Sequence, residues 1–429
     1  MKIAVIGAGW AGCAAAVEAT RRGHDVTVFE ASRTPGGRAR RVDGAFDGKA
    51  LPLDNGQHIL IGAYTETLQL MADLGLDTSS VLLHMPLTLQ FPDGSGIRLP
   101  KLAAPFDALI GILTAKAWTW RDRLSLLRAA TGWQLRGFQC DAGQSVTDLC
   151  RSLSPGAMAS LIEPLCVSAL NTPPERASGQ VFLRVLHDSL FSISGGSNLL
   201  LPRAHLSALL PDAALSWLTA QGGCVQTGVR VKSIIRTGDR WQLETDRSES
   251  SSGFDAVVLA CPPAEAARLA EPCVSSGATW VTKARGLNYE GIATVYVMAP
   301  GKRLARPLLA LHALAGQPAQ FVFDRGQLGG PAGLLAFVVS ASVGDNATLT
   351  AQVLDQAAAQ LGLQQLQVVQ TIVEKRATFA CTPGLQRPGL QIAPGLLACG
   401  DYVEGPYPAT LEGAVRSGLA AARNLLSIK

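Results

Sequence analysis

The sequence predicts an α/β fold that contains a Rossmann-like nucleotide-binding domain and a second domain interleaved with it. Residues 2–30 read as an apolar strand, a Gly-rich turn, an Ala-rich helix and a second strand, which together make a βαβ unit. A further apolar run at 255–261 stops at two prolines, as expected for a buried parallel strand. A third apolar run at 395–399 ends in Gly-Asp. The nucleotide-binding domain is therefore predicted to be assembled from distant parts of the chain.

The first turn predicts dinucleotide binding. In its sequence, Gly7-Ala8-Gly9-Trp10-Ala11-Gly12, the first glycine allows the tight turn, the second lets a pyrophosphate approach, and the third lets the helix pack on the strand. Glu30 follows Gly12 by eighteen residues, where its carboxylate could bind both ribose hydroxyls and repel a 2′-phosphate. These features favour FAD or NAD over NADP. The alternative is a chance Gly-rich turn, which the flanking strand, helix and acid disfavour.

A second Gly-containing segment, Gly36-Gly37-Arg38, follows Glu30. Backbone N–H groups and a guanidinium could hold a diphosphate from its other side. On its own, the segment reads equally well as a basic surface loop.

A polar cluster follows an apolar lead-in at Asp54-Asn55-Gly56-Gln57-His58. Its central glycine would let a planar ring system pass close to the backbone, while the neighbouring side chains present hydrogen-bonding groups. The alternative is a polar turn that caps the helix expected at 64–74.

These motifs resemble those of the FAD-dependent amine-oxidase and phytoene-desaturase superfamily. Trp10-Ala11, the Gly-Gly-Arg-Ala-Arg segment from Gly36 and the 54–58 cluster look like one branch, the hydroxysqualene dehydroxylases. Near the end of the chain, the Gly400-Asp401 pair and the segment 411–414 are similar to the C-terminal FAD motif of the superfamily. The resemblance implies an amine-oxidase-like fold with FAD held by motifs at both ends of the chain.

The resemblance also implies which residues contact FAD. Val231 would place its backbone against the adenine, Asp401 would bond the ribityl hydroxyls, and the helix that begins near Thr410 would point its N–H groups at the flavin. The full set of expected FAD contacts is Gly7, Ala8, Gly9, Trp10, Ala11, Gly12, Glu30, Ala31, Gly36, Gly37, Arg38, Asn55, Gly56, Gln57, Val231, Gly400, Asp401, Leu411, Glu412, Gly413 and Ala414.

The reaction that the resemblance implies is reductive: hydroxysqualene, a C30 isoprenoid lipid, becomes squalene in hopanoid or related triterpenoid synthesis. Protonation and loss of an allylic hydroxyl would leave a cation that a hydride from reduced FAD could quench. Asp54 and His58, with Gln57 beside them, are the candidate catalytic residues, and the alternative is that they only orient the loop and the flavin. Because the chain has no second Gly-rich fingerprint for a nicotinamide, an external electron donor is expected.

Three rival functions share the same fold. A carotenoid or polyisoprenoid desaturase would run oxidatively on a polyene precursor. An amine oxidase would need an aromatic pair beside the amine, and Tyr402 and Tyr407 give thin support. A non-catalytic escort for prenylated proteins would not need the intact flavin motifs.

The expected FAD-binding domain comprises residues 1–76, 191–263 and 391–429, and the expected substrate domain comprises 77–190 and 264–390. Residues 222–235 read as a strand pair, and 264–390 read as strands that wall a pocket, without a titratable cluster. The 77–190 part reads as amphipathic helices with Trp and Arg. Core packing explains most of these residues, and contact with a membrane surface is the alternative reading.

The bulk composition limits other functions. A net charge of +4 spread along the chain does not support nucleic-acid binding. The nine cysteines include no CxxC spacing and no Cys/His pairing, which predicts reduced thiols and no metal site. Since no apolar run reaches membrane-spanning length and the chain starts directly with a strand, we expect a cytoplasmic protein, with a peripheral position on the cytoplasmic membrane as the alternative. The oligomeric state is not predicted.

Overall fold

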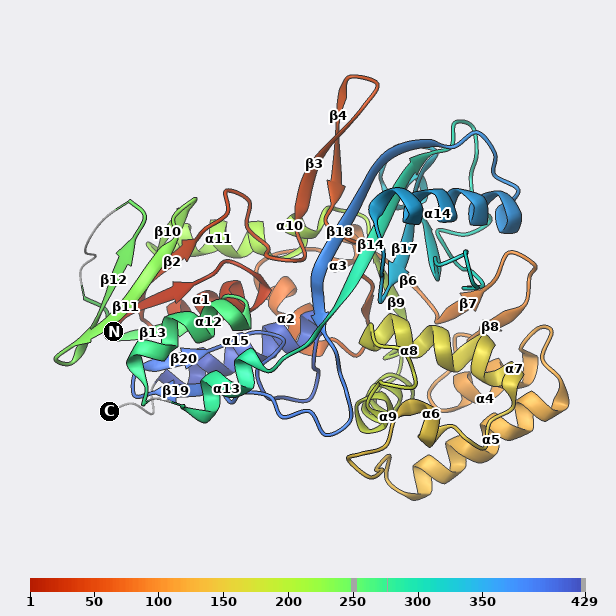
Figure 1. The fold of residues 1–429 in the computed structure, drawn as a ribbon, viewed down its shortest axis with the longest axis horizontal. Coiled ribbons are helices and arrows are strands. Elements are labelled where there is room, and N and C mark those ends of the chain that lie inside the picture. Colours follow the sequence, from red (N-terminus) through yellow and green to blue (C-terminus); the bar gives the residue numbers. More distant parts are fainter. Residues whose placement is uncertain (248–252, 276, 426–429) are drawn as a thin grey trace.

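A mostly parallel sheet forms one half of the computed structural model, which describes residues 1–247, 253–275 and 277–425 (Figure 1). In spatial order its strands are β10 (Cys224–Thr227), β2 (Asp25–Glu30), β1 (Lys2–Ile6), β13 (Ala256–Leu259), β20 (Leu396–Ala398) and β19 (Gln391–Ala393). Neighbouring strands pair in parallel, except that β19 is antiparallel to β20. The predicted α/β, Rossmann-like fold is confirmed, and the strand expected after Asp255 lies between the first strand and the C-terminal one.

Alternate residues of the first strand face opposite sides of this sheet. Ile3 and Val5 pack among the helices α1 (Trp10–Arg21), α11 (Pro211–Ala220) and α15 (Leu411–Asn424). Ala4 and Ile6 belong to the core on the other side, which includes residues of α12 (Pro263–Ala270), α13 (Thr279–Arg285) and the β11 (Val231–Thr237)–β12 (Arg240–Thr245) hairpin. Both faces are therefore covered, as expected for a parallel sheet.

The two strands expected at 222–235 are present, but the prediction that they pair with each other is wrong. β10 pairs in parallel with β2 at the edge of the sheet, whereas β11 pairs with β12. Between the two strands, the Val229 N–H donates to Glu30 O at 2.9 Å, so the chain turns out of the sheet at this point. The apolar pattern predicted both strands but not their partners.

An antiparallel sheet forms the other half, in the spatial order β15 (Leu308–Ala310), β16 (Phe321–Asp324), β17 (Leu334–Ser340), β14 (Tyr289–Met298) and β18 (Gln367–Phe379). These strands confirm the strands predicted in this region, which also contains the helix α14 (Asn346–Leu361). Ala293, Val295 and Val297 of β14 pack with the helix in one core. Thr294 and Tyr296 alternate with them and so point to the opposite face.

Helices gather at the lower right of Figure 1, away from the parallel sheet. The amphipathic helices expected in 77–190 are present, but the apolar pattern from Pro105 to Trp120 is not one helix, because Lys116 bridges to Gly96 and Ala117 turns the chain with a φ of +64°. The elements here are α4 (Phe106–Thr114), α5 (Trp120–Leu135), α6 (Val146–Leu149), α7 (Pro155–Ala157), the π-helical η1 (Met158–Ile162), α8 (Glu163–Leu170), α9 (Gly179–His187) and the π-helical η2 (Asp188–Ser192). Within the described ranges, none of the helices combines the length and apolar character needed to cross a bilayer.

Shorter elements complete the fold. β3 (Arg41–Phe46) and β4 (Lys49–Asp54) form a hairpin that projects at the top of Figure 1 and delivers Asp54 at its base. The others are β5 (Leu60–Ile61), α2 (Thr65–Asp73), α3 (Thr78–Val81), β6 (Leu82–Met85), β7 (Thr88–Gln90), β8 (Gly96–Arg98), β9 (Leu199–Pro202), α10 (Leu206–Leu209), η3 (Glu271–Cys273) and η4 (Arg325–Leu328).

Candidate functional site

The first turn leaves no room for side chains at two of its glycines. Gly7 has a φ of +113°, and a Cβ placed on it would lie 2.6 Å from Ala260 O. A Cβ on Gly12 would lie 1.9 Å from Gly7 O. Gly9 is the N-cap of α1, and its nearest neighbour, the Gly37 Cα, would be 3.8 Å from such a Cβ. The turn thus presents an open backbone surface at a helix N-terminus, which suits an anion.

Glu30 ends β2 beside this turn. Its Oε2 accepts the Ala8 N–H at 2.7 Å, and its Oε1 accepts the Ser32 N–H at 2.8 Å. A carboxylate oxygen can accept more than one hydrogen bond, so both oxygens can still bind hydroxyl groups. Ala31, the next residue, is exposed. Val231, which is buried and starts β11, lies two residues after Val229, whose N–H donates to Glu30 O.

The second Gly-containing loop lies directly against the first. The Gly36 N–H donates to Ala8 O at 2.8 Å, and the buried Trp10 donates its Nε1–H to Ala39 O at 3.2 Å. Trp10 therefore holds the loop through its indole, while Ala11 beside it is buried on α1. The two predicted phosphate-binding segments form one surface.

Arg38 connects this surface to the C-terminal motif. Its guanidinium donates to Asp401 Oδ1 at 2.5 Å and to Ala377 O at 2.6 Å. The Asp401 side chain is 9% exposed and that of Arg38 is 37% exposed. The preceding Gly400 donates its N–H to Ser417 Oγ of α15 at 2.6 Å. Segments that are more than 350 residues apart in sequence therefore meet at one ion pair.

The segment 411–414 starts α15, which confirms the helix start expected near Thr410, and the Thr410 hydroxyl caps it by accepting the Gly413 N–H at 2.9 Å. The side chain of Glu412 does not follow the expectation of a cofactor contact. It is fully buried and accepts the N–H groups of Glu66 and Thr67 at 3.1 and 3.0 Å and the Thr67 hydroxyl at 2.6 Å. Its carboxylate holds the N-terminus of α2, so at Glu412 only the backbone remains to face a ligand.

The 54–58 loop connects both halves of the molecule. Asn55 donates its N–H to Arg40 O at 2.9 Å and its Nδ2–H to Arg38 O at 3.1 Å, which joins the loop to the Gly36–Arg38 segment. Gln57 donates to the Tyr296 hydroxyl at 2.8 Å and accepts from Arg325 at 3.3 Å, which joins it to the antiparallel sheet.

Tyr296 and Arg325 correct the expectation that 264–390 carries no titratable cluster. Tyr296 lies in an apolar strand pattern, and its hydroxyl donates to Asp54 O at 2.8 Å. Arg325 is 6% exposed and donates to Pro202 O at 3.1 Å. The alternation of polar and apolar residues along β14 could have indicated that Tyr296 faces a polar site. The sequence around Arg325 contains no comparable pattern.

Asp54 is 3% exposed and lies among polar groups. Its Oδ1 accepts the Leu206 N–H at 2.9 Å, its Oδ2 lies 3.8 Å from the Arg325 guanidinium, and His205 Nδ1 lies 3.8 Å from Oδ1. Burial raises the pKa of Asp54, and these three neighbours oppose the increase. Burial also lowers the pKa of His205. The Asp54 carboxyl therefore favours a proton more than an exposed aspartate does.

His58 lies at the other end of the loop. Burial lowers its pKa to about 4, so the imidazole is neutral at pH 7, and Nδ1 lies 3.4 Å from Gly56 O. A Cβ on Gly56 would lie 3.9 Å from both His58 Cε1 and Thr294 Oγ1. Gly56 therefore faces the strand β14 at Thr294.

Two aromatic residues near the C-terminal motif do not form the pair that amine oxidation would use. Tyr402 is buried and folds back against Gly400, and Tyr407 lies over the guanidinium groups of Arg184 and Arg416 at 5.8 and 5.0 Å. Each of these arginines is also paired with a carboxylate, Arg184 with Asp188 at 2.6 Å and Arg416 with Glu412 at 2.7 Å, so Tyr407 belongs to a charge-paired polar cluster.

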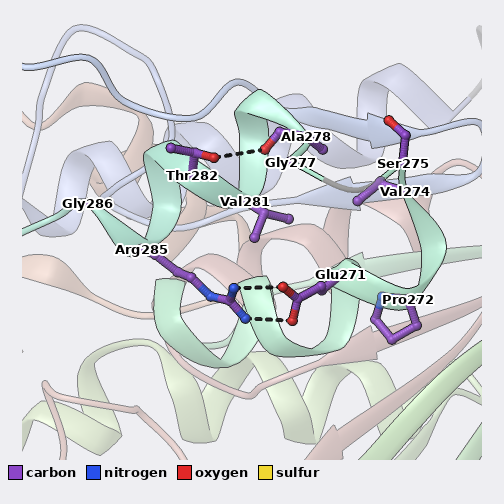
Figure 2. Close-up of a pocket in the computed structure, with 10 residues that line it drawn as sticks. All are labelled: Glu271, Pro272, Val274, Ser275, Gly277, Ala278, Val281, Thr282, Arg285 and Gly286. Carbon is purple, nitrogen blue, oxygen red and sulfur yellow. Dashed lines mark hydrogen bonds and ion pairs between the residues drawn. The ribbon is translucent and has the colours of Figure 1, made fainter.

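A surface pocket of about 690 Å³ lies elsewhere, between η3 and α13 (Figure 2). Glu271 and Arg285 line it and neutralise each other through bonds of 2.6 and 2.7 Å. None of the predicted site residues lines this pocket.

The predicted ligand-binding groups thus lie at the carboxyl ends of β1, β2 and β20, the edge at which open parallel sheets bind nucleotides. Fold and site together define a dinucleotide-binding protein. The chain belongs to the flavin-containing amine oxidoreductase family, whose model matches residues 10–426.

Individual relatives support this membership. The chain is 28% identical to a hydroxysqualene dehydroxylase of Rhodopseudomonas palustris, over 99% of this chain and 98% of that protein. It is 26% identical to a probable zeta-carotene desaturase of Synechococcus elongatus, over 60% of this chain and 56% of that one. A putative protoporphyrinogen oxidase from Exiguobacterium shares the fold with a TM-score of 0.71 at 17% identity, over 100% and 99% of the two chains. The resemblance to hydroxysqualene dehydroxylases is confirmed, and the protein is an FAD-dependent oxidoreductase.

The residues of this structure fit FAD. The cradle at Gly9 and Gly37 has backbone exposed on both loops, and Glu30 stands beside it. Within the described ranges, the hydroxyls of Thr294 and Tyr402 are buried but have no hydrogen-bond partner in the polypeptide. Buried hydroxyls are normally paired, so these two groups are suited to a bound molecule.

Proposed function

We propose that this protein converts hydroxysqualene to squalene by FAD-dependent reductive dehydroxylation, in hopanoid or related triterpenoid synthesis. The observation that carries the proposal is the full-length similarity to a hydroxysqualene dehydroxylase, which includes both sheets and the helical part. The desaturase match covers a smaller share of both chains. The substrate is then a C30 isoprenoid lipid, and its binding region is the substrate domain proposed at 77–190 and 264–390, with FAD held by 1–76, 191–263 and 391–429.

The proposed reaction breaks one allylic C–O bond and forms one C–H bond. The hydroxyl leaves as water after it takes a proton, and bound reduced FAD supplies the hydride that joins the carbon. Each turnover consumes two electrons, which an external donor must return. The polypeptide has to provide the proton, exclude bulk water and align the lipid.

We propose Asp54 as the group that holds this proton, because its pKa is raised by burial and its carboxyl lies at the base of the loop. His58, the other candidate, is less suited to this role, because a pKa of about 4 leaves its imidazole without the extra proton at pH 7. Gln57 would act as a positioning residue, since its amide links Tyr296 to Arg325.

The direct test is a single anaerobic turnover. The flavin-loaded protein is reduced chemically and mixed with hydroxysqualene, the flavin spectrum is followed, and the extracted lipid is analysed. Flavin reoxidation with an equal amount of squalene is the expected result. Reduced flavin that persists in the presence of hydroxysqualene would contradict the proposal.

Two matched variants separate the proton donors. Asp54→Asn keeps an oxygen that can accept the Leu206 N–H, and His58→Gln keeps a polar side chain of similar length. If Asp54 holds the proton, its variant should slow reoxidation at least a hundredfold, whereas His58→Gln should slow it less. Equal rates for Asp54→Asn and the unmodified protein would rule out Asp54.

A polyisoprenoid desaturase is the second candidate, favoured by the partial similarity to the carotene desaturase. In that case a polyene precursor would bleach the oxidised protein by reducing its flavin, and a product with one more double bond would appear. The same spectrometer and extraction distinguish the two functions, because the flavin changes in opposite directions.

A further inference from the structure

Helix α4 presents an apolar stripe to solvent. Phe106, Leu109, Ile110 and Leu113 are 61, 40, 39 and 40% exposed and follow the i, i+3, i+4, i+7 spacing of one helix face. The opposite face packs tightly, since a Cβ on Gly111 would lie 2.3 Å from Leu99 Cδ2. The stripe is therefore a true outer surface of the helix.

The stripe continues onto neighbouring residues. Leu102, before α4, is 46% exposed, and Trp120 and Leu124 of α5 are 73 and 46% exposed. Arg123 lies over the Trp120 ring at 5.0 Å and donates to Ala115 O at 2.9 Å, which fixes the start of α5 next to the end of α4. Figure 1 places both helices at the end of the molecule farthest from the parallel sheet.

Every exposed charge in this region is positive. Residues 98–136 contain seven basic side chains, Arg98, Lys101, Lys116, Arg121, Arg123, Arg128 and Arg136, and two acidic ones. Both acids are buried: Asp107 is 5% exposed, and Asp122 is 8% exposed and accepts hydrogen bonds from Thr119 and Ser154. The charge of this surface therefore complements an anionic partner.

We propose that the α4–α5 surface, defined as residues 98–136, docks onto an anionic lipid bilayer. The exposed apolar stripe enters the interface, Trp120 lies at headgroup depth, and the basic side chains contact the headgroups. A partner with an apolar interior and an anionic boundary matches both features at once, whereas a second copy of this surface would bring like charges together. This inference does not depend on the identity of the substrate.

The test is flotation of the flavin-loaded protein with vesicles. Vesicles of phosphatidylcholine mixed with phosphatidylglycerol should carry the protein to the top of the gradient, and raising the salt should reduce this binding. The double variant Leu109→Asp/Leu113→Asp should lose at least about 90% of the bound fraction. Reversing Lys116 or Arg121 to Glu should weaken binding to anionic vesicles at least fivefold for each position.

The matched control is Ile235→Asp/Val343→Asp. These apolar side chains, 58 and 85% exposed, lie on β11 and in the loop before α14, so the control makes the same charge change at other exposed apolar positions and should leave flotation unchanged. Retained flavin absorbance in every variant shows that the fold is intact. Equal flotation of the α4 variant and the control would overturn the proposal. Sedimentation velocity gives a second outcome that would overturn it. If the unmodified protein were a dimer and the α4 variant a monomer, the stripe would be an interface between two copies of this chain.

Discussion

Replacing Glu412 by glutamine tests whether this buried carboxylate serves α2 or the cofactor. One carboxylate oxygen accepts from the Glu66 N–H and from Arg416 Nε, and the other accepts from the Thr67 N–H and hydroxyl. An amide has one acceptor oxygen, so its NH₂ group must face at least one buried N–H donor. We expect the free energy of unfolding to fall by about 3 kcal/mol, from one unsatisfied buried donor and weaker bonds to the others.

This loss corresponds to a decrease in Tm of about 3 °C, since the entropy of unfolding is about 2 cal/mol/K per residue. The measurement is thermal unfolding with and without added FAD. Because the structure directs the side chain to α2, the flavin-free protein should lose the same amount as the flavin-loaded protein. Glu175→Gln, at an exposed carboxylate, is the control and should stay within about 0.5 kcal/mol of the unmodified protein.

A different pattern would refute this reasoning. If the flavin-free Tm of the Glu412 variant were unchanged while its affinity for FAD decreased, the carboxylate would serve the cofactor instead of α2.

Three further results are expected. Gly12→Ala should abolish flavin retention, because the new Cβ would lie 1.9 Å from Gly7 O. Retention is measured by flavin absorbance after gel filtration. The control Gly23→Ala, at a turn with open space around it, should retain flavin. His58 should destabilise the protein in acid, because burial lowers its pKa to about 4 in the folded state, against about 6.5 in the unfolded chain. The free energy of unfolding should therefore be highest above about pH 6.5 and should fall by about 3 kcal/mol as the pH decreases through 4. Unfolding of His58→Gln by denaturant should lack this part of the pH dependence, and an identical pH profile would contradict the assignment. The Thr294 hydroxyl bonds no polypeptide group among the described residues, so Thr294→Val should leave the flavin-free stability within about 1 kcal/mol. The variant should weaken the binding of flavin or lipid, measured by titration. Unchanged binding would mean that this hydroxyl meets neither ligand.

Local patterns predicted the parts of the site whose geometry is local. The turn from Gly7 to Gly12 needs glycine for steric reasons that act within a few residues, and Glu30 follows at a distance set by one helix and one strand. The Thr410 cap is similarly local. These features were therefore readable from the sequence alone.

Long-range partners were not readable in the same way. The motif at 411–414 correctly indicated a helix start, but the partner of the Glu412 carboxylate is Thr67, 345 residues earlier. Tyr296 lies within an apolar strand pattern and meets Asp54 across 242 residues. A propensity or a spacing carries no information on such pairs, because chain topology alone brings them together.

The order of segments in the parallel sheet constrains how the protein is made. β13 lies between β1, from the start of the chain, and β20, which is synthesised after more than 130 further residues. Until the ribosome has released β20 and α15, one edge of β13 is unpaired and the α1 surface that receives Gly418 is bare. Exposed strand edges and apolar helix faces promote aggregation. The surface that the C-terminal segments complete, including the Arg38–Asp401 ion pair, can therefore form only after residues 396–424 have been synthesised.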